Sequence, residues 1–300
     1  MSQIVELGDF LRSCRGRLSP ADAGMPRTSR RRVPGLRREE LAQLAGVSSD
    51  YYTRLEQGRS RTASPEILES LATALRLDDT EREHLFDLAN RRPTQRRASR
   101  PTPAERVSPA VRQLLSTLDS AGCPAFVLGR RTDVLAANPL SRALIADFAT
   151  MPAGERNQTR FVFLDPAARE LYADWDTVAA DTAAMLRMDA GRHPDDRQLR
   201  ELVGEVAARS ADFRVYWAER RVHERTEGTK EYHHPVVGDL TVTYQALSLP
   251  GDSEQTLFIY STEPGSSSES ALRFLTTWSN ASPGGQPRAA AALRSASFAK

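Results

Sequence analysis

The sequence predicts a multidomain protein, in which an all-α domain of five helices precedes an α+β domain with an antiparallel sheet. Apolar side chains recur at three- and four-residue spacing through residues 1–90, as is typical of amphipathic helices. Residues 91–107 are rich in proline and arginine and lack apolar periodicity, as expected of a linker. From residue 108, strand-like runs alternate with helical patterns. We therefore expect domains over residues 1–90 and 108–281, and a disordered tail over residues 282–300.

Within the first domain, residues 36–58 read LRREELAQLAGVSSDYYTRLEQG and predict two short helices joined by a tight turn. The first helix should span residues 37–45. Gly46 stands where the chain must reverse, and the Ser48 hydroxyl can cap the second helix. The side chains expected to pack between the helices are Leu41, Leu44, Ala45, Val47, Tyr52 and Leu55. A helix–turn–helix of this kind places its second helix in the DNA major groove, although a plain helical pair has the same periodicity.

Three further helices complete the predicted first domain. One spans residues 4–18, and the connection after it, residues 19–34, is unusually long for a helical domain. That connection is either an insert or a basic arm that lies on DNA. Ser64 and Pro65 open a fourth helix as its cap and first residue. Asp78, with an acid three residues later at Glu81, resembles a capping box for a fifth helix.

The second domain is predicted from five strand-like runs and the helices between them. A short helix near residues 108–118 leads into two strands that flank a tight turn, and Asn138-Pro139 then starts a helix. Long helices should follow near residues 166–190 and 199–217. The strands are expected at residues 125–128, 133–137, 229–237, 239–248 and 255–262.

The distribution of charge and the cysteine content indicate which kind of protein this sequence encodes. Residues 1–107 hold 20 arginines against 15 acidic residues, whereas residues 108–300 hold 21 basic and 24 acidic residues, so the basic half is the half that holds the helix–turn–helix. All basic residues are arginine except Lys230 and Lys300. The two cysteines are far apart and should be free thiols. Without a secretion signal or a membrane-spanning run, the sequence predicts a cytosolic protein.

No pattern of catalytic or metal-binding residues stands out. The chain has no G-x-S-x-G elbow, phosphate-binding loop, G-x-G-x-x-G fingerprint or H-E-x-x-H motif. His233 and His234 fall in a predicted strand, where neighbouring side chains point to opposite faces, so they cannot act as joint ligands. We therefore expect no enzyme activity, no bound metal and no cofactor.

The solvent face of the second helix of the helix–turn–helix supplies the candidate DNA contacts. Arg54 can bind guanine through two hydrogen bonds, and Asp50 can accept one from a cytosine amino group. The candidates for contacts with base edges are Ser49, Asp50, Thr53 and Arg54. The candidates for contacts with phosphates are Arg37, Arg38, Tyr51, Gln57, Arg59 and Arg61, of which Tyr51 is expected to be exposed. Solvated surface side chains are the alternative for each of them.

The second domain is rich in large apolar side chains, which form either an ordinary core or a pocket for an elongated apolar molecule. The members of this set are Phe126, Phe161, Phe163, Trp175, Met185, Trp217 and Tyr244. Polar ends for such a ligand are available at Asn138, Arg187, His234 and Tyr244. Of these, Arg187 is the natural partner of a carboxylate.

Two resemblances sharpen these expectations. The run EELAQLAGVS with the later RLEQG, including Glu40, Gly46 and the segment Leu55-Glu56-Gln57-Gly58, resembles the phage-repressor-like DNA-binding domain of Xre-type transcription regulators. In the second half, PAFVLGRRTDVLAANPLSRALIADF, RFVFLDPAARELYADWDTVAADTAAMLRMDAGRHPDD and GTKEYHHPVVGDLTVTYQALSLPGDSEQTLFIYSTEPGSSSESALRFL resemble the MmyB-type ligand-binding domain. That domain is PAS-like, with a five-stranded antiparallel sheet and helices over one face, and its pairing with an Xre-type domain is characteristic of actinobacterial regulators.

The resemblances imply a cytoplasmic transcription regulator that binds operator DNA, is expected to form a homodimer on it, and senses a small fatty-acid-like ligand. Because one helix–turn–helix reads only a few base pairs, dimers bind two half-sites one helical turn apart. The main alternative keeps DNA binding but makes the second domain a dimerisation or protein-interaction module without a ligand. A second alternative is an enzyme or redox sensor with a bound cofactor.

Overall fold

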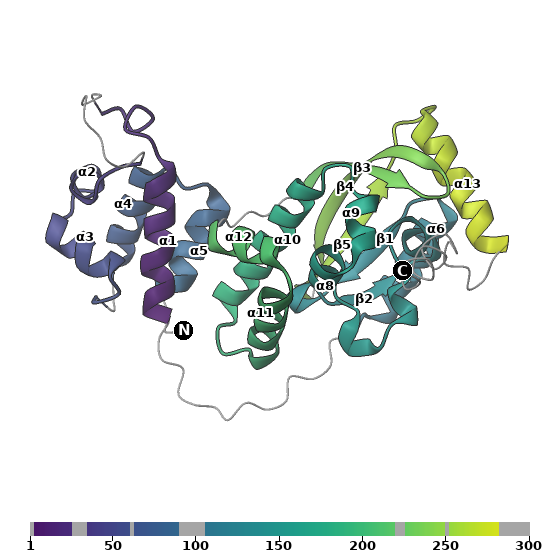
Figure 1. Cartoon of the computed structure of the whole chain (residues 1–300), viewed down its shortest axis with the longest axis horizontal. Helices are drawn as coiled ribbons and strands as arrows, with labels where there is room; N and C mark the ends of the chain where they lie inside the picture. Colours follow the sequence, from purple (N-terminus) through teal and green to yellow (C-terminus); the bar gives the residue numbers. More distant parts are fainter. Residues whose placement is uncertain are drawn as a thin grey trace, which may run out of the picture. The chain divides into compact units, whose positions relative to one another are not determined.

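The computed structural model describes residues 3–25, 35–60, 63–89, 106–219, 226–249 and 252–281. The predicted linker up to residue 105, the tail after residue 281 and most of the connection over residues 19–34 lie outside the described residues. The chain divides into two compact units (Figure 1). Most of the first unit comes from residues 1–101, and residues 187–198 and 215–224 are grouped with it.

The predicted five helices of the first domain are confirmed. They are α1 (Gln3–Arg17), α2 (Arg38–Leu44), α3 (Ser49–Glu56), α4 (Pro65–Leu75) and α5 (Asp79–Ala89). Gly46 has a φ of +66°, which turns the chain between α2 and α3. The Ser48 hydroxyl accepts a hydrogen bond from the Tyr51 amide, so the predicted cap is present. Glu81 donates its amide to the Asp78 carboxylate, but its own carboxylate pairs with Arg17 instead of closing a capping box.

An aliphatic core holds these helices together. Leu41, Ala45, Tyr52 and Leu55 are buried as predicted, and Val47 packs partly buried against them. Leu44 is different: its side chain is 40% exposed, and Ala42 is the buried residue in that turn. The prediction for Leu44 was wrong because α2 has only seven residues and buries a narrow face along Leu41, Ala42 and Ala45.

Gly8 allows α1 to approach the end of α3 very closely. A Cβ atom at this position would lie 2.2 Å from the Glu56 carbonyl oxygen, far inside van der Waals contact. By contrast, a Cβ atom at Gly16 on the same helix would meet nothing within 4 Å. The two helices are therefore packed backbone to backbone at Gly8.

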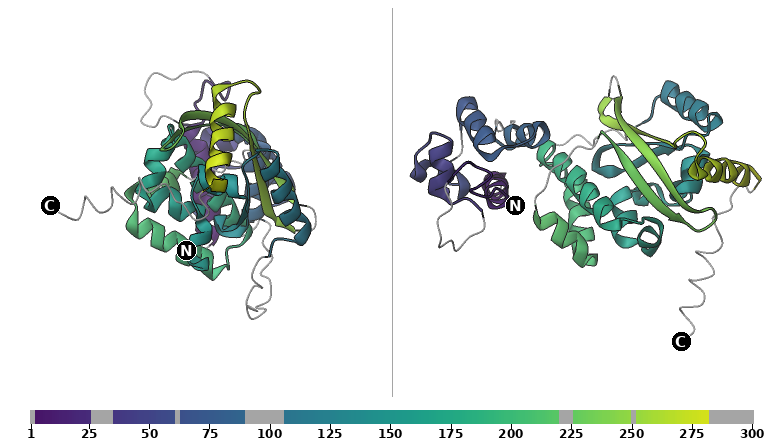
Figure 2. Two further views of the ribbon diagram at one scale, coloured as in Figure 1. Left: turned by 90° about the vertical axis from the view of Figure 1, so that its right-hand side faces the viewer. Right: turned by 90° about the horizontal axis from the view of Figure 1, so that it is seen from above.

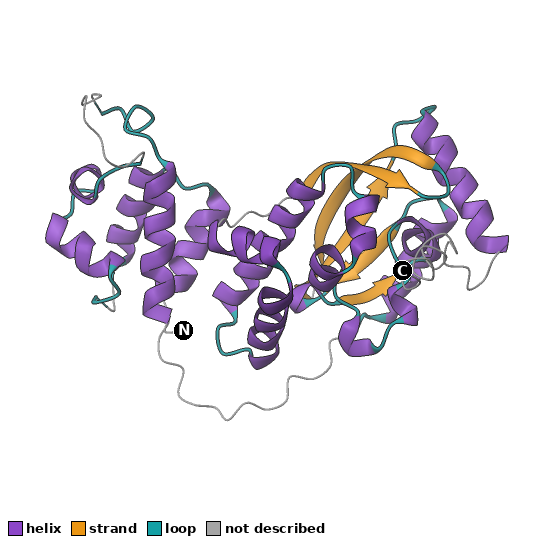
Figure 3. Ribbon diagram, in the orientation of Figure 1, coloured by secondary structure: helices purple, strands orange, loops and turns teal. Residues whose placement is uncertain are grey.

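The second domain has the predicted α+β architecture with one five-stranded antiparallel sheet (Figure 3). The strand order is β2-β1-β5-β4-β3, for strands β1 (Ala125–Leu128), β2 (Val134–Ala137), β3 (Glu227–His234), β4 (Gly238–Leu249) and β5 (Asp252–Ser261). The helices are α6 (Pro109–Ser120), α7 (Pro139–Leu144), α8 (Gln158–Leu164), α9 (Pro166–Leu171), α10 (Trp175–Arg192), α11 (Arg197–Arg209), α12 (Ala211–Glu219) and α13 (Ser267–Ala281). Short 3-10 turns are η1 (Arg130–Thr132), η2 (Phe148–Thr150) and η3 (Ala153–Glu155).

Two predicted long helices are each broken into a pair. The helix expected over residues 166–190 is interrupted because Tyr172 forms a β-bridge with Tyr232, and Ala173 donates its amide to the Glu231 carbonyl. The helix expected over residues 199–217 ends at Ser210, whose hydroxyl caps α12 by accepting from the Phe213 amide. Both breaks depend on contacts or caps that apolar periodicity does not reveal. The sequence also did not predict α8.

One face of the sheet is covered by helices, and the other face is covered in part. On one face, α6 packs Val111, Leu115 and Leu118 against residues of β1 and β5. Phe126 lies between Ala125 and Val127 on β1 and points to the other face, which helices α7 to α10 cover (Figure 2). The expectation of helices over one face was therefore incomplete, because α6 covers the outer side of β1 and β5.

The sequence also led to predictions about the cysteines and about membrane-spanning segments. Cys14 and Cys123 are free, as predicted. Across the described residues, no helix combines the length and the apolar character needed to cross a bilayer.

Candidate functional site

The outward face of α3 carries the four residues predicted to contact bases. Ser49, Asp50 and Arg54 are exposed, and Thr53 is half-buried. Asp50 and Arg54 lie one helical turn apart and form an ion pair of 3.8 Å. Because both side chains are more than half exposed, this pair is weak and both groups remain available to a ligand on that face. The structure thus brings the four predicted residues together on one short helix.

The residues predicted to contact phosphates lie in different environments. Arg37, Gln57 and Arg59 are exposed at the start of α2 and just after α3. Arg38 is engaged inside the domain, where its guanidinium donates to the Glu56 carboxylate at 2.8 and 3.0 Å. Arg61 lies outside the described residues.

Tyr51 corrects one sequence expectation. It is half-buried and packs against the aliphatic core, whereas the sequence predicted an exposed ring. The reason is that α3 buries a broad face, so the residue before Tyr52 also reaches the core.

Glu56 is the buried centre of the first domain and was not assigned a role from the sequence. Its carboxylate, 1% exposed, accepts hydrogen bonds from Arg15 at 2.9 and 3.0 Å, from Arg38, and from Arg12 at 3.4 Å. Although burial favours the neutral acid, the hydrogen bonds from Arg15 and Arg38 hold the pKa of Glu56 below its usual value. These contacts tie α1, α2 and α3 together and so fix the helix that carries Arg54.

A sequence signal for this cluster existed. Glu56 follows Tyr52 and Leu55 at the spacing of a buried helix face, and a buried carboxylate requires cations as partners. The partner residues Arg12 and Arg15 are 44 and 41 residues away in sequence, so the sequence alone does not identify them.

In the second domain, aromatic rings cover the inner face of the sheet. Phe126 stacks on Phe258 with ring centroids 5.1 Å apart, and Tyr260 lies 5.8 Å from Phe126. Tyr244 meets Tyr260 edge to face at 6.1 Å. Farther along the same face, the ring centroids of Tyr172 and Tyr232 are 5.3 Å apart. This face therefore carries a set of packed rings, beside the buried aliphatic side chains of Leu240 and Val242.

A polar pocket of about 230 Å³ opens at one end of this aromatic face. It lies between the first half of α10 and strands β3 and β4, and its lining residues are Asp174, Thr177, Val178, Asp181, Thr229, Lys230, Glu231 and Tyr244. The Lys230 ammonium nitrogen lies 5.0, 5.9 and 6.0 Å from the ring centroids of Tyr244, Tyr260 and Tyr172. Neither Lys230 nor the ring pair of Tyr172 and Tyr260 was among the predicted ligand contacts.

A second, apolar pocket lies deeper under α7 and α8. It is lined by Phe126, Val134, Ala137, Ser141, Ile145, Phe148, Gln158 and Tyr172, and it holds only about 10 Å³, roughly the space of one water molecule. The Gln158 side-chain oxygen is buried without a hydrogen-bond partner among the described residues. Tyr172 links the two pockets, because it lines this one and faces Lys230 in the other.

Of the predicted ligand contacts, Phe126 and Tyr244 line these two pockets, whereas the polar residues Asn138 and His234 serve the fold. The Asn138 amide donates to the Cys123 carbonyl at 2.8 Å, and its oxygen accepts from the Ala125 and Ser141 amides. Those contacts hold β1 and the start of α7. The His234 ring lies 3.0 Å from the Ala143 carbonyl oxygen, and burial lowers its pKa. His233 is exposed on the opposite face, as the strand pattern predicted.

Three of the other predicted contacts form ring pairs and do not line either pocket. Phe161 packs edge to face against Phe148 at 5.6 Å and against Tyr172 at 6.5 Å. Phe163 meets Trp175 edge to face at 5.9 Å. Met185 on α10 is half-buried.

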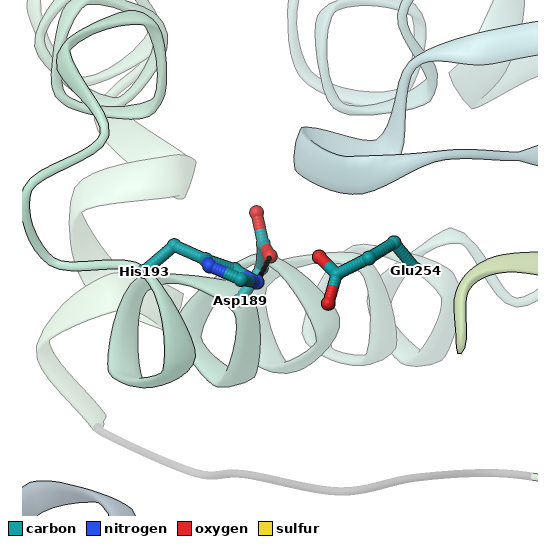
Figure 4. Close-up of side chains that lie close together, drawn as sticks. All are labelled: Asp189, His193 and Glu254. Atoms are coloured by element: carbon teal, nitrogen blue, oxygen red, sulfur yellow. Dashed lines mark ion pairs between the residues drawn. The ribbon is translucent and has the colours of Figure 1, made fainter. Parts of the chain in front are cut away.

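Arg187, the predicted partner of a carboxylate, interacts with a ring instead. Its guanidinium lies over the Trp217 ring at 4.0 Å and donates to the Trp217 carbonyl. Nearby, Asp189 in the last turn of α10 and His193 just after that helix form an ion pair of 3.6 Å (Figure 4). Such contacts between residues four positions apart are typical of helix surfaces.

Comparison with known protein families gives two matches. Residues 107–275 match the model of the MmyB-like transcription regulator ligand binding domain. Residues 6–85 match the model of a helix-turn-helix domain. No curated protein matches the chain.

Proposed function

The chain belongs to the family of MmyB-like transcription regulators, and we propose that it binds operator DNA sequence-specifically and responds to a fatty-acid-like ligand. The two matched domains make it a ligand-responsive transcription regulator. The observation that carries the finer proposal is the inner face of the sheet, where packed aromatic rings meet a pocket that holds a lysine. An apolar surface that ends at an ammonium group suits an amphiphilic acid.

The DNA part of the proposal is supported by the outward face of α3. Ser49, Asp50 and Arg54 are exposed on the second helix of the helix–turn–helix, the element that enters the major groove in such domains. The exposed Arg37 before α2 and the exposed Arg59 after α3 suit phosphate contacts. A homodimer on two half-sites would supply the length of operator that one short helix cannot read.

The ligand would act by shifting populations. A ligand that binds one arrangement of the protein better than another changes the affinity for DNA, and DNA then changes the affinity for the ligand by the same factor. In this proposal the protein works in the cytosol, next to its operator, and carries out no chemical reaction.

The test is binding of the purified full chain to its own upstream promoter DNA and to scrambled DNA, at two salt concentrations, with and without octanoate. We expect a preference for promoter DNA that persists at the higher salt concentration and changes with octanoate. Equal, salt-sensitive binding to both DNAs would contradict sequence-specific recognition. A preference that neither octanoate nor longer fatty acids change would favour a second domain that acts through protein contacts alone.

A further inference from the structure

Lys230 occupies an unusual place for a charged residue. It is the one lysine among the described residues, in a chain whose other basic side chains there are arginines. On β3 it pairs with Val242 of β4 and shares the inward face with Gly228 and Tyr232. Its ammonium is surrounded by the rings of Tyr172, Tyr244 and Tyr260 at 5.0 to 6.0 Å.

Within the described part of the chain, the Lys230 ammonium has no hydrogen-bond or ion-pair partner, and it lies near three ring faces. Ring faces attract a cation, but they do not accept the hydrogen bonds that three ammonium protons can donate. Some other half-buried cations of this domain have carboxylate partners, as Arg131 has in Asp133 and Arg160 has in Glu205. The Lys230 ammonium therefore has donors to offer to an anion that enters the pocket.

Gly228 makes room for this arrangement. A Cβ atom on Gly228 would lie 2.9 Å from the Tyr244 ring, so only glycine lets that ring lie flat against β3 beside Lys230. The geometry of the pocket thus depends on a residue that has no side chain.

Building on the proposed function, we propose that Lys230 binds the acid group of the ligand and that the pocket selects an amphiphile with a single negative charge. The alkyl chain would leave the polar pocket past Tyr172 and enter the apolar pocket under α7 and α8. Since that apolar pocket holds only about 10 Å³, the rings of Tyr172 and its neighbours would have to separate to admit the chain. Ligand binding is thereby coupled to a rearrangement of the aromatic face.

The preference for one negative charge follows from the rim of the pocket. Asp174, Asp181 and Glu231 line it together with Lys230, so acidic groups outnumber the single ammonium. A carboxylate can pair with Lys230 and leave the rim acids facing solvent. A doubly charged headgroup would bring its second charge next to the rim and be repelled.

The test compares three ligands with the same eight-carbon chain, namely octanoate, octan-1-ol and octyl phosphate, by calorimetric titration of the full chain at pH 8. We expect octanoate to bind at least about tenfold more tightly than the alcohol and more tightly than the phosphate. The variant Lys230→Met should bind octanoate and octanol equally, whereas Lys230→Arg should retain part of the preference. Arg273→Met, which removes an exposed charge on α13, should behave as the unaltered protein does.

The possible outcomes distinguish a failure of this proposal from a failure of the proposed function. If the unaltered protein binds octanol as tightly as octanoate, the ligand is amphiphilic or apolar but Lys230 does not bind its acid group. If Lys230→Met keeps the preference for octanoate while its near-ultraviolet circular dichroism is unchanged, another cation binds the acid. Binding of none of the three ligands would overturn both proposals.

Discussion

Each domain has one charged side chain at its centre, and the two differ in whether the protein supplies hydrogen-bond partners for it. In the helical domain, the Glu56 carboxylate is buried and accepts hydrogen bonds from three arginines, so its bonding capacity is used within the protein. In the α+β domain, the Lys230 ammonium lies near three tyrosine rings and has no hydrogen-bond or ion-pair partner among the described residues. This difference indicates where each domain binds its partner. The paired Glu56 makes the helical domain a rigid support for exposed residues. The unpaired Lys230 leaves a site inside the α+β domain open to a ligand.

The strongest test of this contrast is Glu56→Gln. The substitution leaves Arg15 and Arg38 without their anion, and we expect it to destabilise the helical domain by about 4 kcal/mol. The midpoint of thermal unfolding, followed by far-ultraviolet circular dichroism, measures the loss. Glu39→Gln is the matched control, because Glu39 forms an exposed ion pair with Arg37 and should change the unfolding free energy by less than about 0.5 kcal/mol. Equal effects of the two variants would show that the Glu56 cluster is not a structural centre.

Gly8→Ala tests the close backbone contact between α1 and the end of α3, beside the Glu56 cluster. The new methyl group would meet the Glu56 carbonyl and push α1 away, at a cost of about 3 kcal/mol. Gly16→Ala on the same helix meets nothing and should be neutral or slightly stabilising. The melting temperatures of the two variants measure this difference. A Gly8→Ala variant as stable as Gly16→Ala would contradict the close approach of α1 to α3.

The helical domain should also lose stability in mild acid. His84 packs edge-on against Phe10, and burial lowers its pKa to about 3, so the unfolded chain takes up a proton near pH 6.5 that the folded chain excludes. Stability is thus complete above about pH 6.5 and falls as the pH drops toward 3, by about 2 kcal/mol at pH 5. Urea unfolding at pH 7 and pH 5 measures this change. His84→Leu should reduce the pH dependence, whereas replacing the exposed His233 by glutamine should leave it as it is.

Arg54→Ala tests the outward face of α3, which the helical domain holds in place. The loss of a guanine contact should weaken binding to promoter DNA by about 2 kcal/mol and relax the base preference. Binding to promoter and scrambled DNA provides the measurement. If both DNAs lose affinity equally, Arg54 contacts phosphate and does not read bases.

The smallest expected effect concerns the interior site. Gly228→Ala should displace the Tyr244 ring and weaken octanoate binding by about fivefold, or about 1 kcal/mol. Gly204→Ala on α11 is its matched control, since a methyl group there meets nothing. Unchanged octanoate affinity in Gly228→Ala would place the ligand away from Tyr244.

The same contrast explains which features the sequence could predict. Gly46, Ser48 and Ser64 mark turns and caps within a few residues of themselves, and all three have the expected role. The face of α3 that carries Arg54 likewise follows from helical periodicity alone.

Features that depend on distant parts of the chain were not predictable in this way. Arg15 reaches Glu56 across 41 residues. Lys230 meets Tyr172 because β3 forms a bridge with the segment between α9 and α10. The break between α9 and α10 has the same origin, in the bridge from Tyr172 to Tyr232. Arg187 was a reasonable candidate for binding an acid, but periodicity could not show that the Trp217 ring lies against it.

The bridge from Tyr172 to Tyr232 has a further consequence, for the behaviour of the protein in concentrated solution. β3 is the last strand of the sheet, and an edge strand can pair with the edge of another molecule and start aggregation. The bridge protects its downstream half, and Glu227, Lys230 and Glu231 place charges along the strand. A change of Lys230 to an apolar residue therefore removes part of that protection, whereas arginine preserves it. Light scattering should show Lys230→Met to be more prone to self-association than Lys230→Arg.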